Sequence, residues 1–254
     1  MERNWEREVA ARVEFIRNKV AEAHADGIVY GNSGGKDSAL VGILCKMACE
    51  KTVGIVMPAG YMAGMDADER DAGLVSQKYH IEVRYADLTM LRDLAQQMVD
   101  CVTIRLTKGA EINIAPRLRM MVLYGVAASE NLLVAGTGNR SERFVGYFTK
   151  WGDGACDFNP IADLTVGEVY GMLEYLGAPE SIIKKAPSAG LYEGQTDETD
   201  MGITYAAIDK YILTGEAEPE DKAKIDARHA GSLHKLRMPA VYFDTKDDER
   251  RSGD

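Results

Sequence analysis

The stretch Tyr30-Gly31-Asn32-Ser33-Gly34-Gly35-Lys36-Asp37-Ser38 decides the fold of this chain. It lies between a short apolar run at 27–30 and a longer, helix-like apolar run at 39–49. That order predicts a strand, a tight glycine turn and a helix start, where free N–H groups and the helix dipole favour an anion. Asp37 fits beside a phosphate only if a divalent cation lies between the two charges. The stretch therefore predicts a phosphate loop that works with a metal.

The spacing of this loop excludes the two commonest phosphate loops. A Walker loop, G-x-x-x-x-G-K-[ST], would put its first glycine at Tyr30 and a serine or threonine at Asp37. The dinucleotide fingerprint G-x-G-x-x-G is absent as well. The remaining alternative is a serine-glycine turn that only caps a helix. This alternative is disfavoured, because six matching loop residues follow directly after a strand.

Composition restricts the class of protein. The 254 residues fit one large α/β domain, which we expect over 1–243, with a frayed, charged tail over 244–254. The net charge of −10 argues against a nucleic-acid partner held by a broad basic surface. A charged N-terminus and the lack of a long apolar run predict a cytoplasmic protein without a membrane partner. The four cysteines form no C-x-x-C pair, so we expect buried thiols rather than disulfides.

Strands and helices alternate along the chain. Apolar runs typical of buried strands lie at 28–30, 52–57, 81–85 and 132–135, and helical periodicity marks the segments between them and three later segments at 164–176, 203–213 and 219–229. This predicts an α/β fold, a Rossmann-like doubly wound parallel sheet with helices on both faces. Ligands of such sheets bind beyond the carboxyl ends of the strands, where 31–38 falls. Residues 185–200 are predicted to be a mobile loop, and 103–114 carry no clear pattern.

A series of motifs makes a family resemblance specific. Ser33 to Ser38 resembles the pyrophosphate loop of the ATP pyrophosphatases, the adenine nucleotide α-hydrolase-like enzymes that split ATP between its α and β phosphates. Together with the later motifs, it closely resembles the ammonia-dependent NAD synthetases. The later motifs are Gly136-Thr-Gly-Asn-Arg-Ser-Glu142, Gly146-Tyr-Phe-Thr-Lys-Trp-Gly-Asp-Gly154, Asn159-Pro-Ile-Ala-Asp-Leu164, Pro187-Ser-Ala-Gly-Leu191, Gly194-Gln-Thr-Asp-Glu198, Gly202-Ile-Thr-Tyr205 and His234-Lys235.

The resemblance implies a ligase that uses ATP and Mg²⁺. ATP would adenylate the nicotinate carboxylate of deamido-NAD and release pyrophosphate, and ammonia would then displace AMP to give NAD. Such a reaction needs no side-chain nucleophile, because the adenylate supplies the leaving group. The resemblance further implies a homodimer that uses the helix at 116–130. The chain has no room for the amidohydrolase domain of glutamine-dependent relatives, so we expect it to take ammonia directly or from a separate subunit.

Roles for individual residues also follow from the resemblance. Asp37 and Glu142 would bind Mg²⁺, although Glu142 could instead be a solvated loop residue. Asp153 would take the proton from ammonium. The ATP contacts would be Gly31, Asn32, Ser33, Gly34, Gly35, Lys36, Asp37, Ser38, Thr137 and Ser188, and the deamido-NAD contacts would be Arg119, Lys150, Asp157, His234 and Lys235. The plain alternatives are a surface salt bridge for Arg119 and a core histidine for His234.

The sequence departs from the family pattern at one position, and two alternative functions remain open. Val166 stands where many relatives place a lysine that contacts ATP, and we consider Lys36, Lys184 or Lys185 as the replacement. An ATP pyrophosphatase with another acceptor is one alternative function, although a tRNA-modifying enzyme should show catalytic cysteines and a basic face. A regulatory nucleotide-binding protein is the other, although it would have little use for the carboxylates of both Asp37 and Glu142.

Overall fold

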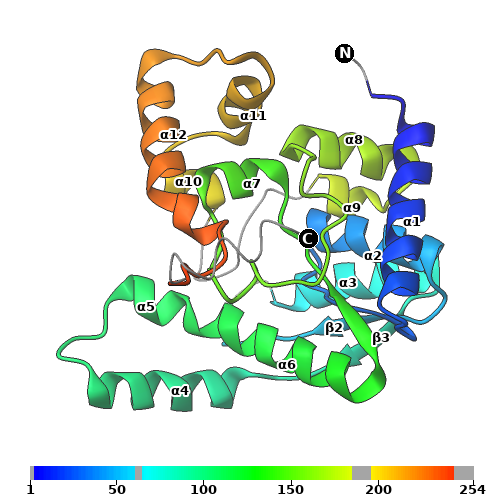
Figure 1. Ribbon diagram of the computed structural model, residues 1–254, viewed down its shortest axis with the longest axis horizontal. Coiled ribbons are helices and arrows are strands. Elements are labelled where there is room, and N and C mark those ends of the chain that lie inside the picture. The colour runs from blue at the N-terminus through cyan, green and yellow to red at the C-terminus, as the bar shows by residue number, and fades with distance from the viewer. Residues whose placement is uncertain (1–2, 61–64, 185–195, 243–254) are drawn as a thin grey trace.

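A four-stranded parallel sheet forms the centre of the computed structural model, which describes residues 3–60, 65–184 and 196–242 (Figure 1). Its order is β3-β2-β1-β4, with an isolated bridge from Ala135 to Phe158 beyond the last strand. The chain thus builds outward on one side of β1 and returns to the other side, which places a topological switch point between β1 and β4. The strands are β1 (Gly27–Gly31), β2 (Thr52–Val56), β3 (Glu82–Tyr85) and β4 (Leu132–Ala135).

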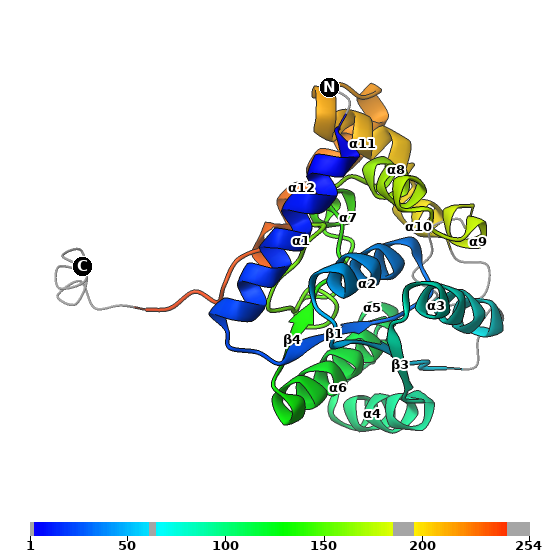
Figure 2. The same cartoon turned by 90° about the vertical axis from the view of Figure 1, so that its right-hand side faces the viewer.

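Helices cover both faces of the sheet (Figure 2). Ile28 and Tyr30 of β1 pack with α1, α2 and α8, whereas Val29 faces the opposite cluster, which α6 covers. This alternation along one strand is the period of two that a sheet buried on both faces requires. The doubly wound α/β fold is therefore confirmed. These helices are α1 (Trp5–Glu22), α2 (Lys36–Ala48), α3 (Met65–Tyr79), α4 (Thr89–Val102), α6 (Ile114–Glu130) and α8 (Val166–Leu176).

A third, smaller core forms among the later helices. Val166 of α8 and Val145 of α7 pack there with Met201, Ile208 and Ile225 from the C-terminal part of the chain. Figure 1 shows α7, α10, α11 and α12 gathered at one end of the molecule, apart from α4 and α6. The remaining helices are α5 (Lys108–Ile112), α7 (Arg140–Val145), α9 (Glu180–Ile183), α10 (Asp197–Met201), α11 (Tyr205–Thr214), α12 (Pro219–Ser232) and the 3₁₀ turn η1 (Leu233–Lys235).

Two segments differ from expectation. The predicted loop at 185–200 is wrong at its end, because Thr196 caps the short helix α10 by accepting from the Thr199 N–H at 3.1 Å. Residues 185–195 and the tail at 244–254 lie outside the described residues. The unclassified segment 103–114 contains α5, which Thr107 caps. Within the described ranges, no helix is both long and apolar enough to span a bilayer.

Candidate active site

The loop between β1 and α2 is fixed by its own residues and by α3. The Asn32 N–H donates to the Ile55 carbonyl at 2.9 Å, and the Asn32 side chain donates to Ser76 Oγ at 3.3 Å. Gly34 has a φ of +73°, and a Cβ there would lie 2.1 Å from the carbonyl oxygen of Asp68, so only glycine fits. Gly35 is the N-cap of α2 and has no side chain to accept from the first N–H groups of the helix. These groups are therefore suited to an anion.

Two carboxylates meet at the switch point, one from each side of it. Asp37 lies in the first turn of α2 after β1, and Glu142 lies in α7 after β4. Asn139 joins them, because its Nδ2 donates to Asp37 Oδ1 at 3.1 Å and its backbone N–H donates to Glu142 Oε2 at 3.1 Å. Asn139 Oδ1 in turn accepts from the Glu142 N–H at 3.0 Å, which completes a capping box. The second oxygens of the two carboxylates are thereby left to face a common point.

Lys36 lies at that point. Its Nζ is 2.7 Å from Asp37 Oδ2 and 4.0 Å from Glu142 Oε1. The lysine side chain is only 7 % exposed and each carboxylate side chain only 16 %. Burial lowers the pKa of Lys36, but the two carboxylates outweigh it and raise that pKa above its ordinary value. Burial, and next the charge of Asp37, raise the pKa of Glu142 well above its ordinary value, and the ammonium of Lys36 opposes this rise only in part.

The donor set fits a magnesium ion. Mg²⁺ is a hard cation that proteins hold with one or two carboxylates together with substrate phosphates. Asp37 Oδ2 and Glu142 Oε1 are oxygens of this kind, they converge on one point, and the point adjoins the phosphate loop. Across the parts of the chain that the structure describes, no three His, Cys, Asp or Glu side chains gather into a metal site of protein ligands alone.

A second polar group lies between α6, the loop after α7 and η1. Arg119 is half-buried and donates from Nε to the Met57 carbonyl at 3.0 Å, just beyond the carboxyl end of β2. Asp153 is exposed, its Oδ1 accepts from the Thr149 N–H at 2.9 Å, and desolvation by the surrounding protein raises its pKa. Lys235 Nζ donates to two carbonyls of the loop, and Asp153 opposes the lowering of the Lys235 pKa that burial causes. The structure thus brings Arg119, Asp153 and Lys235 into one electrostatic neighbourhood.

The other predicted acceptor residues hold scaffold contacts. Lys150 Nζ donates to the His234 carbonyl at 2.9 Å and lies 5.3 Å from the centre of the Trp151 ring. Asp157 accepts from the Val134 N–H at 2.7 Å and from the Tyr124 hydroxyl at 3.3 Å, so both of its oxygens are tied to β4 and α6.

Of the two remaining ATP residues, Thr137 is half-buried on the turn after β4. Ser188 lies outside the described residues.

Nearly the whole chain is similar to proteins of one known family. A sequence profile of the NAD synthase family matches residues 8–239. The chain belongs to this family. An NH(3)-dependent NAD(+) synthetase of Carboxydothermus hydrogenoformans is 46 % identical over 94 % of this chain and 98 % of the relative.

Two solved structures have the same fold and at least 30 % identity. An NMN synthetase from Francisella tularensis matches with a TM-score of 0.90 and 31 % identity, over 95 % of this chain and 99 % of that one. An NH3-dependent NAD synthetase from Campylobacter jejuni matches with a TM-score of 0.78 and 30 % identity, over 95 % and 100 % of the two chains.

Sequence reasoning gave no role to two residues of this candidate site. Asn139 carries a detectable signal, because an Asn three residues before Glu142 is the pattern of a capping box. Tyr205 carries a weaker signal, as the last residue of the motif Gly202-Ile-Thr-Tyr205. Lys36 Nζ lies 5.6 Å from the Tyr205 ring centre, and the Tyr205 hydroxyl donates to the buried Asp197 at 3.0 Å. Val166, which stands where many relatives have a lysine, is 4 % exposed and packs in the third core. Its side chain therefore does not face a ligand.

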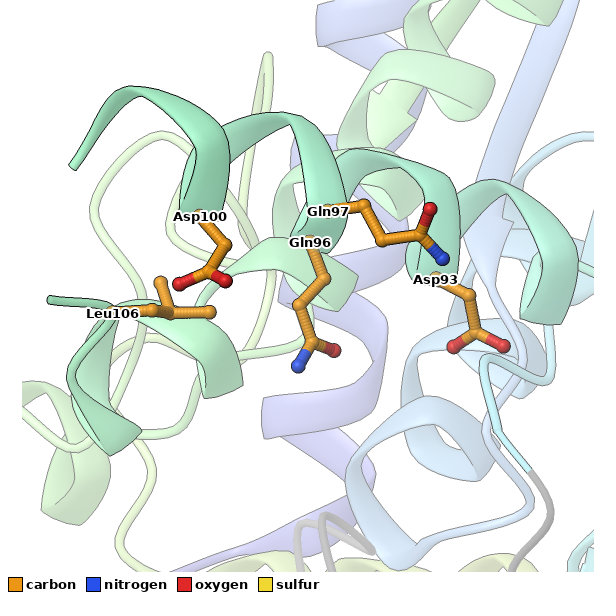
Figure 3. Close-up of a pocket in the computed structure, with 5 residues that line it drawn as sticks. All are labelled: Asp93, Gln96, Gln97, Asp100 and Leu106. Atoms are coloured by element: carbon orange, nitrogen blue, oxygen red, sulfur yellow. The ribbon is translucent and has the colours of Figure 1, made fainter.

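A hollow of about 380 Å³ on α4 is separate from these residues (Figure 3). Four of the five residues that line it are polar, and none of the five is a residue that the family resemblance singles out. The residues that line it are Asp93, Gln96, Gln97, Asp100 and Leu106.

Proposed function

We propose which residues of this chain carry out the ammonia-dependent synthesis of NAD. The activity itself follows from membership in the family. ATP adenylates the nicotinate carboxylate of deamido-NAD with release of pyrophosphate, and ammonia then attacks the acyl carbon and displaces AMP. One observation carries the proposal: Asn139 holds Asp37 and Glu142 as a pair beside a glycine phosphate loop at the switch point. A nucleotide-binding protein without chemistry has no use for two buried carboxylates that repel the phosphates it binds.

The ATP end of the site consists of the loop and the carboxylate pair. The N–H groups at the start of α2 and the hydroxyls of Ser33, Ser38 and Thr137 would bind the phosphates. Asp37 and Glu142 would hold Mg²⁺, which when bound neutralises charge that develops on the phosphates. Hydrogen bonds within the loop hold its serines in place. Ser33 Oγ lies 3.1 Å from Ser38 Oγ, and Ser38 Oγ donates to the Gly35 carbonyl at 3.0 Å. Lys36 and Ser188 complete the proposed set.

The acceptor end uses the second polar group. Arg119, Lys150, Asp157, His234 and Lys235 would bind deamido-NAD. Asp153 would take the proton from ammonium as the base. Asp153 is exposed, but desolvation by the surrounding protein raises its pKa. This shift brings the carboxylate nearer to the range where a general base works. The Thr149 N–H fixes its orientation. Positioning of the reactants then supplies the catalysis that a covalent nucleophile supplies elsewhere.

A mononucleotide acceptor is the second candidate. It is favoured by one observation, the TM-score of 0.90 with a protein named NMN synthetase, against 0.78 with the NAD synthetase from Campylobacter jejuni. Nicotinate mononucleotide carries the same carboxylate as deamido-NAD and lacks the AMP half. The chemistry would be the same, and only the groups that bind the second nucleotide would differ.

A homodimer through α4 and α6 is also part of the proposal. An apolar stripe at i, i+4 spacing runs along α4, with Met90, Leu94, Met98 and Val102 between 53 and 85 % exposed, and Met121 of α6 is 52 % exposed. A stripe of this kind marks an interaction face. Met98→Asp should convert the dimer to a monomer in light scattering after size-exclusion chromatography. Leu213→Asp on α11, also an exposed apolar residue, is the matched control.

The test is one assay of purified protein with Mg²⁺, ATP, ammonium and either deamido-NAD or nicotinate mononucleotide. With deamido-NAD, the products NAD, AMP and pyrophosphate should form in equal amounts and only with Mg²⁺. Asp37→Asn should abolish turnover, whereas Asp26→Asn, an exposed aspartate before β1 at the opposite end of the sheet, should leave it unchanged.

Each other outcome selects a different function. A higher kcat/KM with the mononucleotide would favour the second candidate, and AMP without an amide product would indicate another acceptor. If folded protein binds ATP and never cleaves it, the regulatory binding protein is the correct function.

A further inference from the structure

The carboxylate pair is already divided between two partners in the structure. Asn139 binds one oxygen of each carboxylate, Asp37 Oδ1 and Glu142 Oε2. The other oxygens, Asp37 Oδ2 and Glu142 Oε1, are the pair that would bind a divalent cation. These same two oxygens face Lys36 Nζ, at 2.7 and 4.0 Å. The ammonium therefore lies where the metal must go.

The position of Lys36 in the fold is otherwise unfavourable for a cation. Lys36 is the first residue of α2, and a positive charge at a helix N-terminus opposes the helix dipole. Its side chain is 7 % exposed, and a buried ammonium is costly unless it is paired. Asp37 and Glu142 provide that pairing. The benefit of a lysine here thus lies in its charge between the two carboxylates.

Displacement of the ammonium would depend on a new partner for it. A divalent ion that replaced Lys36 in the absence of a nucleotide would leave the ammonium buried, with the Tyr205 ring at 5.6 Å as a weak alternative. A phosphate bound to the adjoining loop would offer oxygens to the same ammonium. Binding of the metal and of ATP would then favour each other, which is a linkage between the two ligands.

We propose that Lys36 is an internal counter-cation that holds the metal position between Asp37 and Glu142 until ATP and the metal enter together. This inference rests on the proposed metal role of the two carboxylates. It assigns Lys36 a function in metal affinity rather than only in ATP affinity. In the protein without nucleotide, Lys36 keeps both carboxylates in place and weakens the binding of a divalent ion.

The experiment is a titration with Mn²⁺, counted as free ion by electron paramagnetic resonance, at one fixed pH in a mildly alkaline buffer. Without nucleotide, Lys36→Gln and Lys36→Met should bind Mn²⁺ about tenfold more tightly than the parent, because one nearby positive charge is removed. A non-hydrolysable ATP analogue should strengthen Mn²⁺ binding strongly in the parent and weakly in both variants. Lys46→Gln on the same helix, whose ammonium contacts Glu50, is the control and should match the parent.

The outcomes separate this inference from the function on which it rests. If both Lys36 variants bind Mn²⁺ as the parent does without nucleotide, the inference is overturned. If Asp37→Asn binds Mn²⁺ like the parent in the presence of the analogue, the metal role itself is wrong. Melting temperatures give a second measurement if a variant folds poorly. A loss that Mn²⁺ restores supports the inference, and a loss that Mn²⁺ does not restore contradicts it.

Discussion

Asn139 offers the sharpest test of how the site is built, because its two functions can be removed separately. Its Nδ2 donates to Asp37, and its Oδ1 caps α7 by accepting from the Glu142 N–H. Serine is also a good N-cap but is too short to reach Asp37. Asn139→Ser should therefore remove only the bond to the carboxylate, whereas Asn139→Ala should remove the bond and the cap.

The magnitudes follow from the partners. A hydrogen bond to a charged group is worth about 1.5–3 kcal/mol, and Asn139 is fully buried, so water does not replace it. A cap is worth about 1 kcal/mol. We expect Asn139→Ser to lower the free energy of unfolding by about 1.5–3 kcal/mol and Asn139→Ala by about 2.5–4 kcal/mol. Both variants should raise the Mg²⁺ concentration needed for half-maximal activity, because Asp37 is no longer held toward Glu142.

Urea unfolding of metal-free protein measures the stabilities, and initial rates over a Mg²⁺ series measure the site. Asn4→Ala is the matched control, since Asn4 caps α1 by accepting from the Arg7 N–H at 3.0 Å, far from the loop in sequence. It should lose the cap energy and keep the parent's Mg²⁺ dependence. The reasoning is refuted if Asn139→Ser is as stable as the parent, or if the serine and alanine variants are equally unstable.

Three further predictions follow from burial and backbone geometry. Burial and Asp37 raise the folded-state pKa of Glu142 above 4.5, so metal-free protein should lose stability as the pH rises from about 4.5 toward that higher pKa. Urea unfolding over a pH series measures this slope, and Glu142→Gln should remove it. The Tyr30 hydroxyl is buried without a hydrogen-bond partner among the described residues, so Tyr30→Phe should raise unfolding stability by about 1 kcal/mol, and a loss would show that the hydroxyl is bonded. Gly34→Ala should cost about 1–3 kcal/mol in the same measurement and raise the KM for ATP, because its Cβ overlaps the Asp68 carbonyl; unchanged values would contradict the left-handed turn.

The sheet and the phosphate loop were predictable because they depend on local pattern. Three of the four strands are mostly apolar runs of four or five residues, and the loop joins one of them to a helix, so neighbours in sequence carry the information. The exposed edge strand β3 was found as well, although its burial is slight. The order β3-β2-β1-β4 was not predicted, since a doubly wound sheet allows other orders.

The contacts that assemble the site were not predictable from local pattern. Asp37 and Asn139 are 102 residues apart, and nothing in either segment specifies that an amide of one meets an oxygen of the other. The approach of Tyr205 to Lys36 depends on the third core, in which Tyr205 packs with Val145 and Ile208. The helix α10 was missed because five residues give too little periodicity, and only the cap at Thr196 marks it.

The strand order itself explains why a lysine is tolerated at this helix start. β1 and β4 are neighbours and parallel, so the first turns of α2 and α7 both begin at the carboxyl edge of the sheet. Each of these turns carries a carboxylate, Asp37 on one and Glu142 on the other, which suits the positive end of its own helix. Bringing the two turns together sets like charges against each other at low exposure, and the cost grows with burial. A single ammonium from one of the same turns, at Lys36, offsets part of that repulsion, and a divalent ion that displaced it would bring one more positive charge to the same two oxygens.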